Sequence, residues 1–372
     1  MSGDGRNIDT SLGILTGEAS QQKVASDVVP WKHEKPQVFG TEASQRRGRE
    51  TGDPTYYDRP VIKSPVWSWS IPAYYYTGGV TGGCAVLGAA ATLLNRKGLP
   101  VLVRKSRWIG VIGATVSAGL LIYDLGKPSL FLNMLRVFRP TSPMSVGSWI
   151  LVTFSSTAGL SVITEFAPES VQWIGNASAV AAGILGLALS GYTGVLIANT
   201  TVPVWQRPHR LLPGLFLASA AASAASLFDL VGVGEEEHTA VTLFGVAGKV
   251  AEVGFATLIE RNVASVPEAV RPLREGFSGF LWKSGKVLSA ASLALSLIPG
   301  SSTRLRRATG VLGTAGAICI RFGIHYAGNR SAMNPRATFH QQRQGQGAFE
   351  VTGKAAIAGP GGLRSFAPEP VR

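Results

Sequence analysis

The sequence has few of the residues that ligate metals. Of its 372 residues only two are cysteine and five are histidine, whereas a conventional iron–sulfur cluster takes about four cysteine ligands. Cys84 and Cys319 each lie inside an apolar stretch, so we also expect no disulfide. A membrane haem needs two histidines that face each other, and only His325 lies inside such a stretch. The sequence therefore predicts no iron–sulfur cluster, no haem and no other metal site.

Charged residues are also scarce. They make up 15% of the chain, against 45% hydrophobic residues and 45 glycines, a composition typical of closely packed membrane helices. The two ends differ from the middle, because residues 1–66 and 328–372 are polar and rich in Gly, Ser, Gln and Arg. We therefore expect a polar arm (1–66), a transmembrane domain (67–327) and a polar tail (328–372).

The middle of the chain contains eight apolar runs that approach the roughly 20 residues needed to cross a bilayer. The fourth is the clearest, since no charged residue occurs from Trp173 to Gln206. Continuous apolar runs favour helices over the alternating strands of a membrane barrel. We predict an all-α, polytopic fold of eight transmembrane helices, arranged as two four-helix bundles. The runs are Ile71–Leu94, Trp108–Leu125, Met144–Ile163, Trp173–Ala198, Leu211–Leu230, Ala240–Ile259, Leu281–Ile298 and Ala308–Ala327.

The cations that flank these runs predict the orientation. With the amino terminus inside, twelve near-membrane cations are inside and eight are outside. The acidic run Glu235–Glu237 would then lie in an outer loop, and no signal-peptide core occurs in the arm. We expect a bacterial-type inner membrane protein with both termini in the cytoplasm. The net charge of +13 reflects topology and contact with anionic lipid, and we expect no nucleic-acid partner.

A polar loop between the second and third runs contains a carboxylate, three cations and three prolines. It begins with Asp124-Leu125-Gly126-Lys127-Pro128 and continues through Arg136 and Arg139 to Ser145. This loop resembles the signature of the polysulfide reductase membrane subunit family (NrfD-like), whose members are the quinone-handling subunits of molybdenum and iron–sulfur respiratory complexes. The resemblance covers residues 65–327.

Two further segments are similar to motifs of that family. The first is the aromatic entry to the first run, from Trp67 through Trp69 to Tyr74, and the second is Ser190-Gly191-Tyr192-Thr193-Gly194 at the end of the fourth run. The resemblance implies quinone-site residues at Tyr74 and Tyr192. An even number of crossings separates these segments, so they should reach the same membrane face as Asp124. Aromatic residues at such positions also form ordinary interfacial belts, and that alternative stays open.

The resemblance and the residue chemistry together predict a quinone site formed by Trp69, Tyr74, Asp124 and Tyr192. The quinone would be menaquinone or ubiquinone. Asp124 is the expected catalytic residue, because a carboxylate at the hydrocarbon edge can exchange a proton; a simple helix-end cap is the alternative. In the family this face receives the iron–sulfur subunit, so Lys127, Arg136 and Arg139 are docking candidates, or else membrane anchors.

Four ionisable residues lie deeper in the apolar runs. Lys249 and Glu252 are spaced i, i+3, and Arg321 and His325 are spaced i, i+4, so each pair shares one helix face. Charge inside a bilayer is costly unless it is paired or hydrated. These residues are therefore candidates for a proton path, with structural ion pairs as the alternative.

The resulting functional prediction is a membrane subunit of a multi-subunit oxidoreductase that is not catalytic alone. It would exchange electrons between a ferredoxin-like iron–sulfur subunit and the quinone pool, next to a catalytic subunit of the molybdopterin type. A transporter or ion channel is the main alternative, favoured by the buried charges, and a structural membrane anchor is another.

Overall fold

The computed structural model describes residues 7–9, 14–16, 60–94, 99–300 and 302–338. The chain divides into two units, Met1–Arg59 and Pro60–Arg372. In the first unit, strands β1 (Asn7–Asp9) and β2 (Ile14–Thr16) form a short antiparallel pair. Most of the predicted polar arm and tail lies outside the described residues, so the predicted domain boundaries at 66 and 328 stay predictions.

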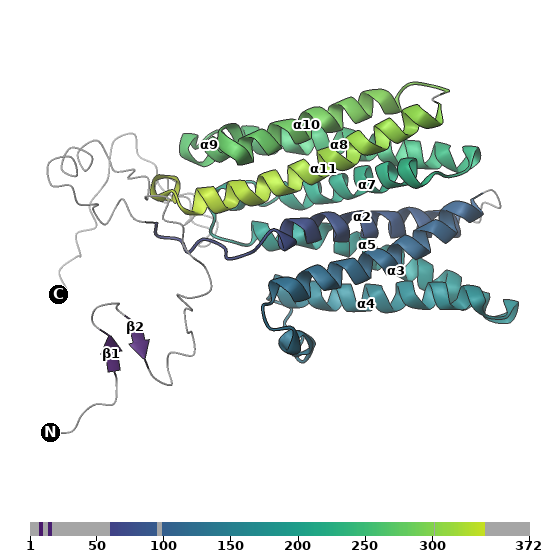
Figure 1. Cartoon of the computed structure of the whole chain (residues 1–372), viewed down its shortest axis with the longest axis horizontal. Coiled ribbons are helices and arrows are strands. Elements are labelled where there is room, and N and C mark those ends of the chain that lie inside the picture. Colours follow the sequence, from purple (N-terminus) through teal and green to yellow (C-terminus); the bar gives the residue numbers. More distant parts are fainter. Residues whose placement is uncertain (1–6, 10–13, 17–59, 95–98, 301, 339–372) are drawn as a thin grey trace, which may run out of the picture. The chain divides into compact units, whose positions relative to one another are not determined.

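The second unit is helical throughout its described residues, apart from loops and turns (Figure 1). Its described residues form eight helices of 20 residues or more: α2 (Ser70–Leu93), α3 (Pro100–Asp124), α4 (Pro143–Ile163), α5 (Gln172–Ala198), α7 (Leu212–Val231), α8 (Glu235–Val263), α10 (Gly276–Ser296) and α11 (Thr303–Ala332). Shorter helices connect them: η3 (Pro128–Leu135), η4 (Thr164–Phe166), η5 (Glu169–Val171), α6 (Pro203–Gln206) and α9 (Pro267–Arg274).

Five of the described helices are long and apolar enough to cross a membrane. They are Pro100–Asp124, Pro143–Phe166, Glu169–Ala198, Leu212–Val231 and Glu235–Val263. The predicted all-helical, multi-pass membrane fold is therefore confirmed. Helices α2, α10 and α11 are less apolar, because α2 is rich in Gly, Thr and Tyr and the other two contain Lys283, Lys286 and Arg321. The count of eight spans stays a prediction.

The long helices contact one another in two groups. Helix α2 packs against α3 and α5, and α4 packs against the same two helices. In the other group α7 packs against α8 and α11, and α10 packs against α8 and α11. Helix α7 also contacts α2 and α5, which joins the groups (Figure 1).

Small residues let α2 and α5 approach closely. A Cβ atom added at Gly186 would lie 2.8 Å from the Gly82 carbonyl oxygen, and one added at Gly82 would collide with the Gly186 backbone. The neighbouring Gly83 faces α7, where its Cβ would lie 2.5 Å from the Ala220 carbonyl oxygen. The glycines of α2 therefore place its backbone directly against both neighbours.

The prediction that Glu235–Glu237 lies in a loop is wrong, because these residues form the first turn of α8. The Glu237 carboxylate accepts hydrogen bonds from the backbone N–H groups of Gly234 (2.9 Å) and Leu102 (2.9 Å). Glu237 is thus buried as a cap for α8 and also holds the start of α3. Acidic residues in a first helical turn also interact favourably with the helix dipole, which explains why the helix starts there.

Candidate functional site

The three segments that the sequence singles out meet at one end of the first helix group. Helix α2 begins at that end, α3 and α5 finish there, and η3 follows directly after α3 (left side of Figure 1). Gly126 allows the chain to turn there, since its φ of 70° lies in the left-handed region that favours glycine. Asp124, Tyr74 and Tyr192 all lie within two turns of these helix ends.

Asp124 is held by the segment that leads into α2. Its Oδ1 atom accepts hydrogen bonds from the Ser68 backbone N–H (3.0 Å), the Ser68 hydroxyl (2.6 Å) and the Ser70 hydroxyl (3.2 Å). The two serine hydroxyls are also 2.8 Å apart. The carboxylate is thus fixed by donors that are more than fifty positions away in the sequence.

These contacts give Asp124 a structural role in addition to any chemical one. Helix α2 has no side-chain cap at Trp69, its own N-cap position, and a carboxylate near a helix N-terminus is stabilised by the helix dipole. Asp124 therefore covers the start of α2 from the end of α3. This role needs an acceptor atom but no titratable group, so an asparagine could also perform it.

Tyr74 and Tyr192 form the second contact of the site. Their hydroxyl groups are hydrogen-bonded to each other, and their ring centroids are 6.3 Å apart. Tyr74 is buried, whereas Tyr192 is partly accessible. The ring of Tyr192 lies directly on Gly147 of α4, where a Cβ atom would collide with it. Helices α2, α4 and α5 together therefore fix this pair.

Trp69 does not join that buried pair. Its side chain is 54% exposed and packs against Tyr123, which is 64% exposed, at a centroid distance of 5.8 Å. Trp69 stands between Ser68 and Ser70 in the sequence and Tyr123 precedes Asp124, and both rings lie on the outer surface of the helices. Trp69 is therefore a rim residue, in the kind of exposed aromatic position that is common at membrane interfaces.

His325 of α11 approaches the same end from the second helix group. Its imidazole lies 6.3 Å from the Trp67 ring, 6.2 Å from the Trp205 ring and 6.0 Å from the Tyr75 ring, measured between centroids. The side chain is fully buried, and neither ring nitrogen makes a hydrogen bond to any residue that the structure describes; the Trp67 main chain lies toward the imidazole but outside hydrogen-bond geometry. The Tyr75 hydroxyl is also buried without a partner. Buried polar atoms in native proteins normally have partners, so this cluster has capacity for a ligand or water.

The other three ionisable residues lie farther along the second helix group. Arg321 is buried, donates to the Ser219 hydroxyl (2.7 Å) and lies over the Phe216 ring, 5.6 Å from its centroid. Lys249 donates to the Ser296 hydroxyl (2.7 Å) and not to Glu252. One Glu252 oxygen is buried without a partner. The i, i+3 spacing thus does not produce a direct Lys249–Glu252 pair.

Sequence reasoning missed several residues of these clusters. Ser68 and Ser70 bind Asp124, but nothing in the sequence links them to a carboxylate so distant in the chain. Asp229 forms an ion pair with His238 (3.3 Å) near the far end of α7. The sequence did contain a signal for Asp229, because it is a single carboxylate at the end of an otherwise apolar run.

The three docking candidates are exposed. They lie around η3 and are Lys127, Arg136 and Arg139. The side chain of Leu132, within η3, is 72% exposed. At the same end of the second helix group, the Arg271 side chain donates to Glu275 (2.7 Å) and lowers the pKa of that carboxyl below its usual value. Exposed cations and apolar side chains therefore occupy one end of the bundle side by side.

Comparison with known proteins identifies the family of the chain. A search of curated proteins gives no match to this sequence. The model of one family, described as polysulfide reductase (NrfD_2), matches residues 55–337, a stretch that includes all the described helices and every site residue named above. The chain is thus a multi-pass membrane protein that belongs to the polysulfide reductase family.

Proposed function

We propose that this protein is the quinone-reactive membrane subunit of an oxidoreductase complex, and that it exchanges electrons between a partner iron–sulfur subunit and the membrane quinone pool. The observation that carries the proposal is that Asp124, Tyr74 and Tyr192 lie at one end of the bundle, at the ends of helices α2, α3 and α5. A lipid-soluble ligand would enter there from the membrane. The family membership supports the same function.

The residues at this end fit a quinone head group. A quinone needs hydrogen-bond donors at its oxygens and flat apolar surfaces beside its ring. The Tyr74–Tyr192 pair shares one hydrogen bond, which leaves the second phenolic proton for a ligand. The unpartnered nitrogens of His325 and the hydroxyl of Tyr75 add further capacity. When bound, the quinone would supply two-electron, two-proton redox chemistry.

Residues of the chain itself would accept and conduct the protons. Asp124 is partly accessible, and its second carboxylate oxygen accepts none of the described hydrogen bonds, so it can accept a proton without breaking its contacts to Ser68 and Ser70. Tyr74 and Tyr192 would orient the quinone. The buried residues Lys249, Glu252, Arg321 and His325 would form a proton path through the second helix group, since all four are ionisable groups inside an apolar bundle. Among the described residues, the last three also have buried polar atoms without a hydrogen-bond partner.

The membrane arrangement belongs to the same proposal. All eight long helices would cross the bilayer as two four-helix bundles. Tyr74 and Tyr75 of α2 and Arg321 of α11 are buried against neighbouring helices, and Lys286 of α10 pairs with Glu260 of α8. The site would face the cytoplasm of a bacterial-type inner membrane. The iron–sulfur subunit would dock there on η3 and its cations, next to a catalytic subunit of the molybdopterin type.

Purification of the complex tests this proposal. We expect a ferredoxin-like subunit and a bound quinone to co-purify with the chain. Reversing the charges of Lys127, Arg136 and Arg139 to glutamate should release the partner, because surface charge steers association and suppresses wrong contacts. The matched control reverses Arg304 and Arg307, which are exposed at the other end of the bundle, and should leave the complex intact.

A transporter or ion channel predicts a different result. The buried cations Lys249 and Arg321 favour that alternative, because they could line an ion path. Such a protein would move its substrate across vesicle membranes without a redox partner or quinone. Substrate flux in vesicles of the isolated chain, together with no co-purifying partner, would overturn the proposed function.

A further inference from the structure

The first helix group contains a cavity at the end opposite to Asp124. It has a volume of about 560 Å³ and lies among the last turn of α2, the first turns of α3 and α5, and the segment after α4. Arg107 is separated from Asp124 by 17 positions of the same helix, which corresponds to about 25 Å. The cavity is therefore distinct from the quinone site.

Two arginines and one glutamate set the charge of this cavity. Arg104 and Arg107 both line it, and Glu165 is the one carboxylate among the described residues that line it. Two helices begin and two end around the cavity, so their dipoles largely cancel. The lining side chains therefore leave a net charge of +1, which favours an anion.

Glu165 does not saturate either guanidinium. Its oxygens lie 3.8 Å from the Arg104 Nε and 3.7 Å from the Arg107 Nη1, beyond hydrogen-bond distance. The Arg107 side chain is 11% exposed, donates to Asn176 (2.6 Å) and to the Ser161 carbonyl oxygen (3.4 Å), and has a buried Nε without a partner. A guanidinium has five N–H donors, so Arg107 retains donors for a ligand.

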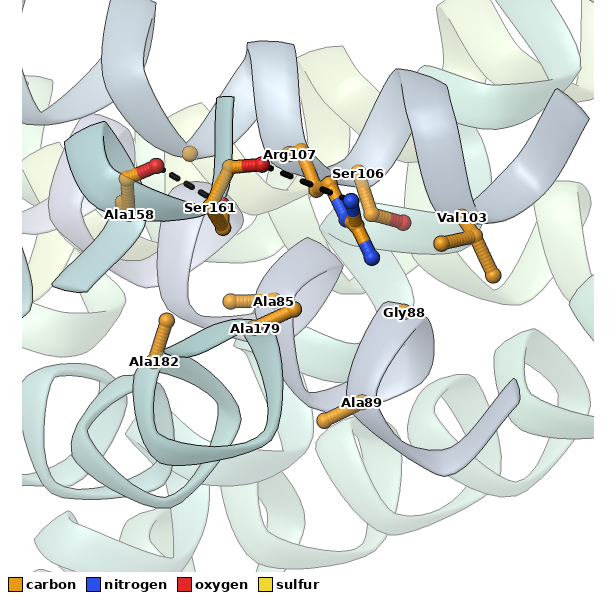
Figure 2. A pocket seen from close by; sticks show the side chains of 11 residues that line it. Ala85, Gly88, Ala89, Val103, Ser106, Arg107, Ala158, Ser161, Ala179 and Ala182 are labelled. Carbon is orange, nitrogen blue, oxygen red and sulfur yellow. Dashed lines mark hydrogen bonds between the residues drawn. The ribbon is translucent and has the colours of Figure 1, made fainter. Parts of the chain in front are cut away.

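The cavity continues inward as a narrow apolar slot of about 20 Å³. The slot shares Val103 and Arg107 with the outer cavity and is otherwise lined mostly by alanine and glycine (Figure 2). Ser106 also lines it, and its hydroxyl is buried without a hydrogen-bond partner. In Figure 2 the Arg107 side chain reaches from α3 toward the small residues of α2 and α5. Arg107 thus lines both the wide, polar cavity and the narrow slot.

We infer that this cavity binds a phosphate-type oxyanion, either free phosphate or the head group of an anionic phospholipid. Arg107 and Arg104 would hold the oxyanion through charge-assisted hydrogen bonds, which suit guanidinium groups especially well. The amide groups of Gln172 and Asn176 on the wall of the cavity would supply neutral hydrogen bonds. Glu165 would compete with the ligand for the arginines. Oxyanion binding in this cavity does not depend on the proposed quinone chemistry.

Two experiments on the full-length protein distinguish the sources of the oxyanion. In nanodiscs of phosphatidylcholine, titration with inorganic phosphate is followed by calorimetry. In nanodiscs that also contain phosphatidylglycerol, native mass spectrometry measures the lipid retained by the protein. Saturable heat in the first experiment identifies free phosphate, and selective retention of the anionic lipid in the second identifies a head group.

Each substitution in this cavity has an expected effect on the affinity for the oxyanion. Arg107→Gln should weaken binding by about tenfold or more, and the more exposed Arg104→Gln should weaken it less. Glu165→Gln should strengthen binding several-fold, because it removes the competing charge. Arg306→Gln, at the same end but paired with Glu235, is the control and should change nothing. Absence of binding in both experiments, or weaker binding in Glu165→Gln, would overturn the inference.

Discussion

Replacement of Asp124 by asparagine should lower quinol turnover of the assembled complex by about a hundredfold or more, the size of effect expected when a general acid–base group is lost. The asparagine keeps an oxygen that can accept the hydrogen bonds from Ser68 and Ser70, so it can still cap α2. The complex should therefore assemble normally. Turnover of the purified complex with a soluble quinol analogue measures the effect.

Three control variants separate proton exchange from structure. Asp124→Glu keeps a carboxylate and should retain more turnover than the asparagine variant. Ser68→Ala removes the shortest of the three hydrogen bonds to Asp124 and should lower quinol turnover by about tenfold. Glu169→Gln changes an exposed carboxylate at the opposite end and should have no effect. Normal turnover in Asp124→Asn would show that Asp124 is only a cap.

Replacement of Gly82 by alanine should destabilise the protein by about 2–3 kcal/mol, because overpacking a close contact forces backbones apart. The added Cβ atom would collide with the Gly186 backbone and the Ser190 hydroxyl, and neither helix can move without disturbing α7. The midpoint of thermal unfolding in detergent, followed by loss of the monodisperse peak, measures the effect.

Gly119 provides the matched control for this prediction. It also lies inside a long helix, but a Cβ atom there meets nothing within 4 Å. Gly119→Ala should therefore leave stability unchanged or raise it by about 0.5–1 kcal/mol, the difference in helix propensity. Equal effects of the two substitutions would contradict the close packing of α2 on α5.

The sequence predicted the helices well where the apolar runs are uninterrupted. The predicted run Trp173–Ala198 corresponds to α5 (Gln172–Ala198), and Met144–Ile163 corresponds to α4 (Pro143–Ile163). It failed at the start of α3, which begins at Pro100 instead of Trp108. The sequence did not predict this start because Lys105 and Arg107 interrupt the apolar run there. In the structure Lys105 donates to carbonyl oxygens at the end of α7, and Arg107 lines a cavity.

The candidate site was predictable only in part. The parity of membrane crossings predicted one membrane face for Tyr74, Asp124 and Tyr192, and in the structure the ends of α2, α3 and α5 that contain them lie at the same end of the bundle. It could not predict their partners, because hydrogen bonds such as Ser68–Asp124 depend on how α2 and α3 are rotated against each other. Trp69 shows the same limit: it is next to Ser68 and Ser70 in sequence, yet it faces outward while Ser70 is buried.

In the proposed function, a quinone head group binds between α2 and α5, next to α3, at the end that contains Asp124. Photolabelling of the assembled complex with an azido-quinone, followed by peptide mass spectrometry, tests it most directly. We predict that the label attaches to the first turns of α2 around Tyr74 or to α5 around Tyr192, and that excess unlabelled quinone prevents it. Labelling confined to α8, α10 or α11, with none on α2 or α5, would contradict the account.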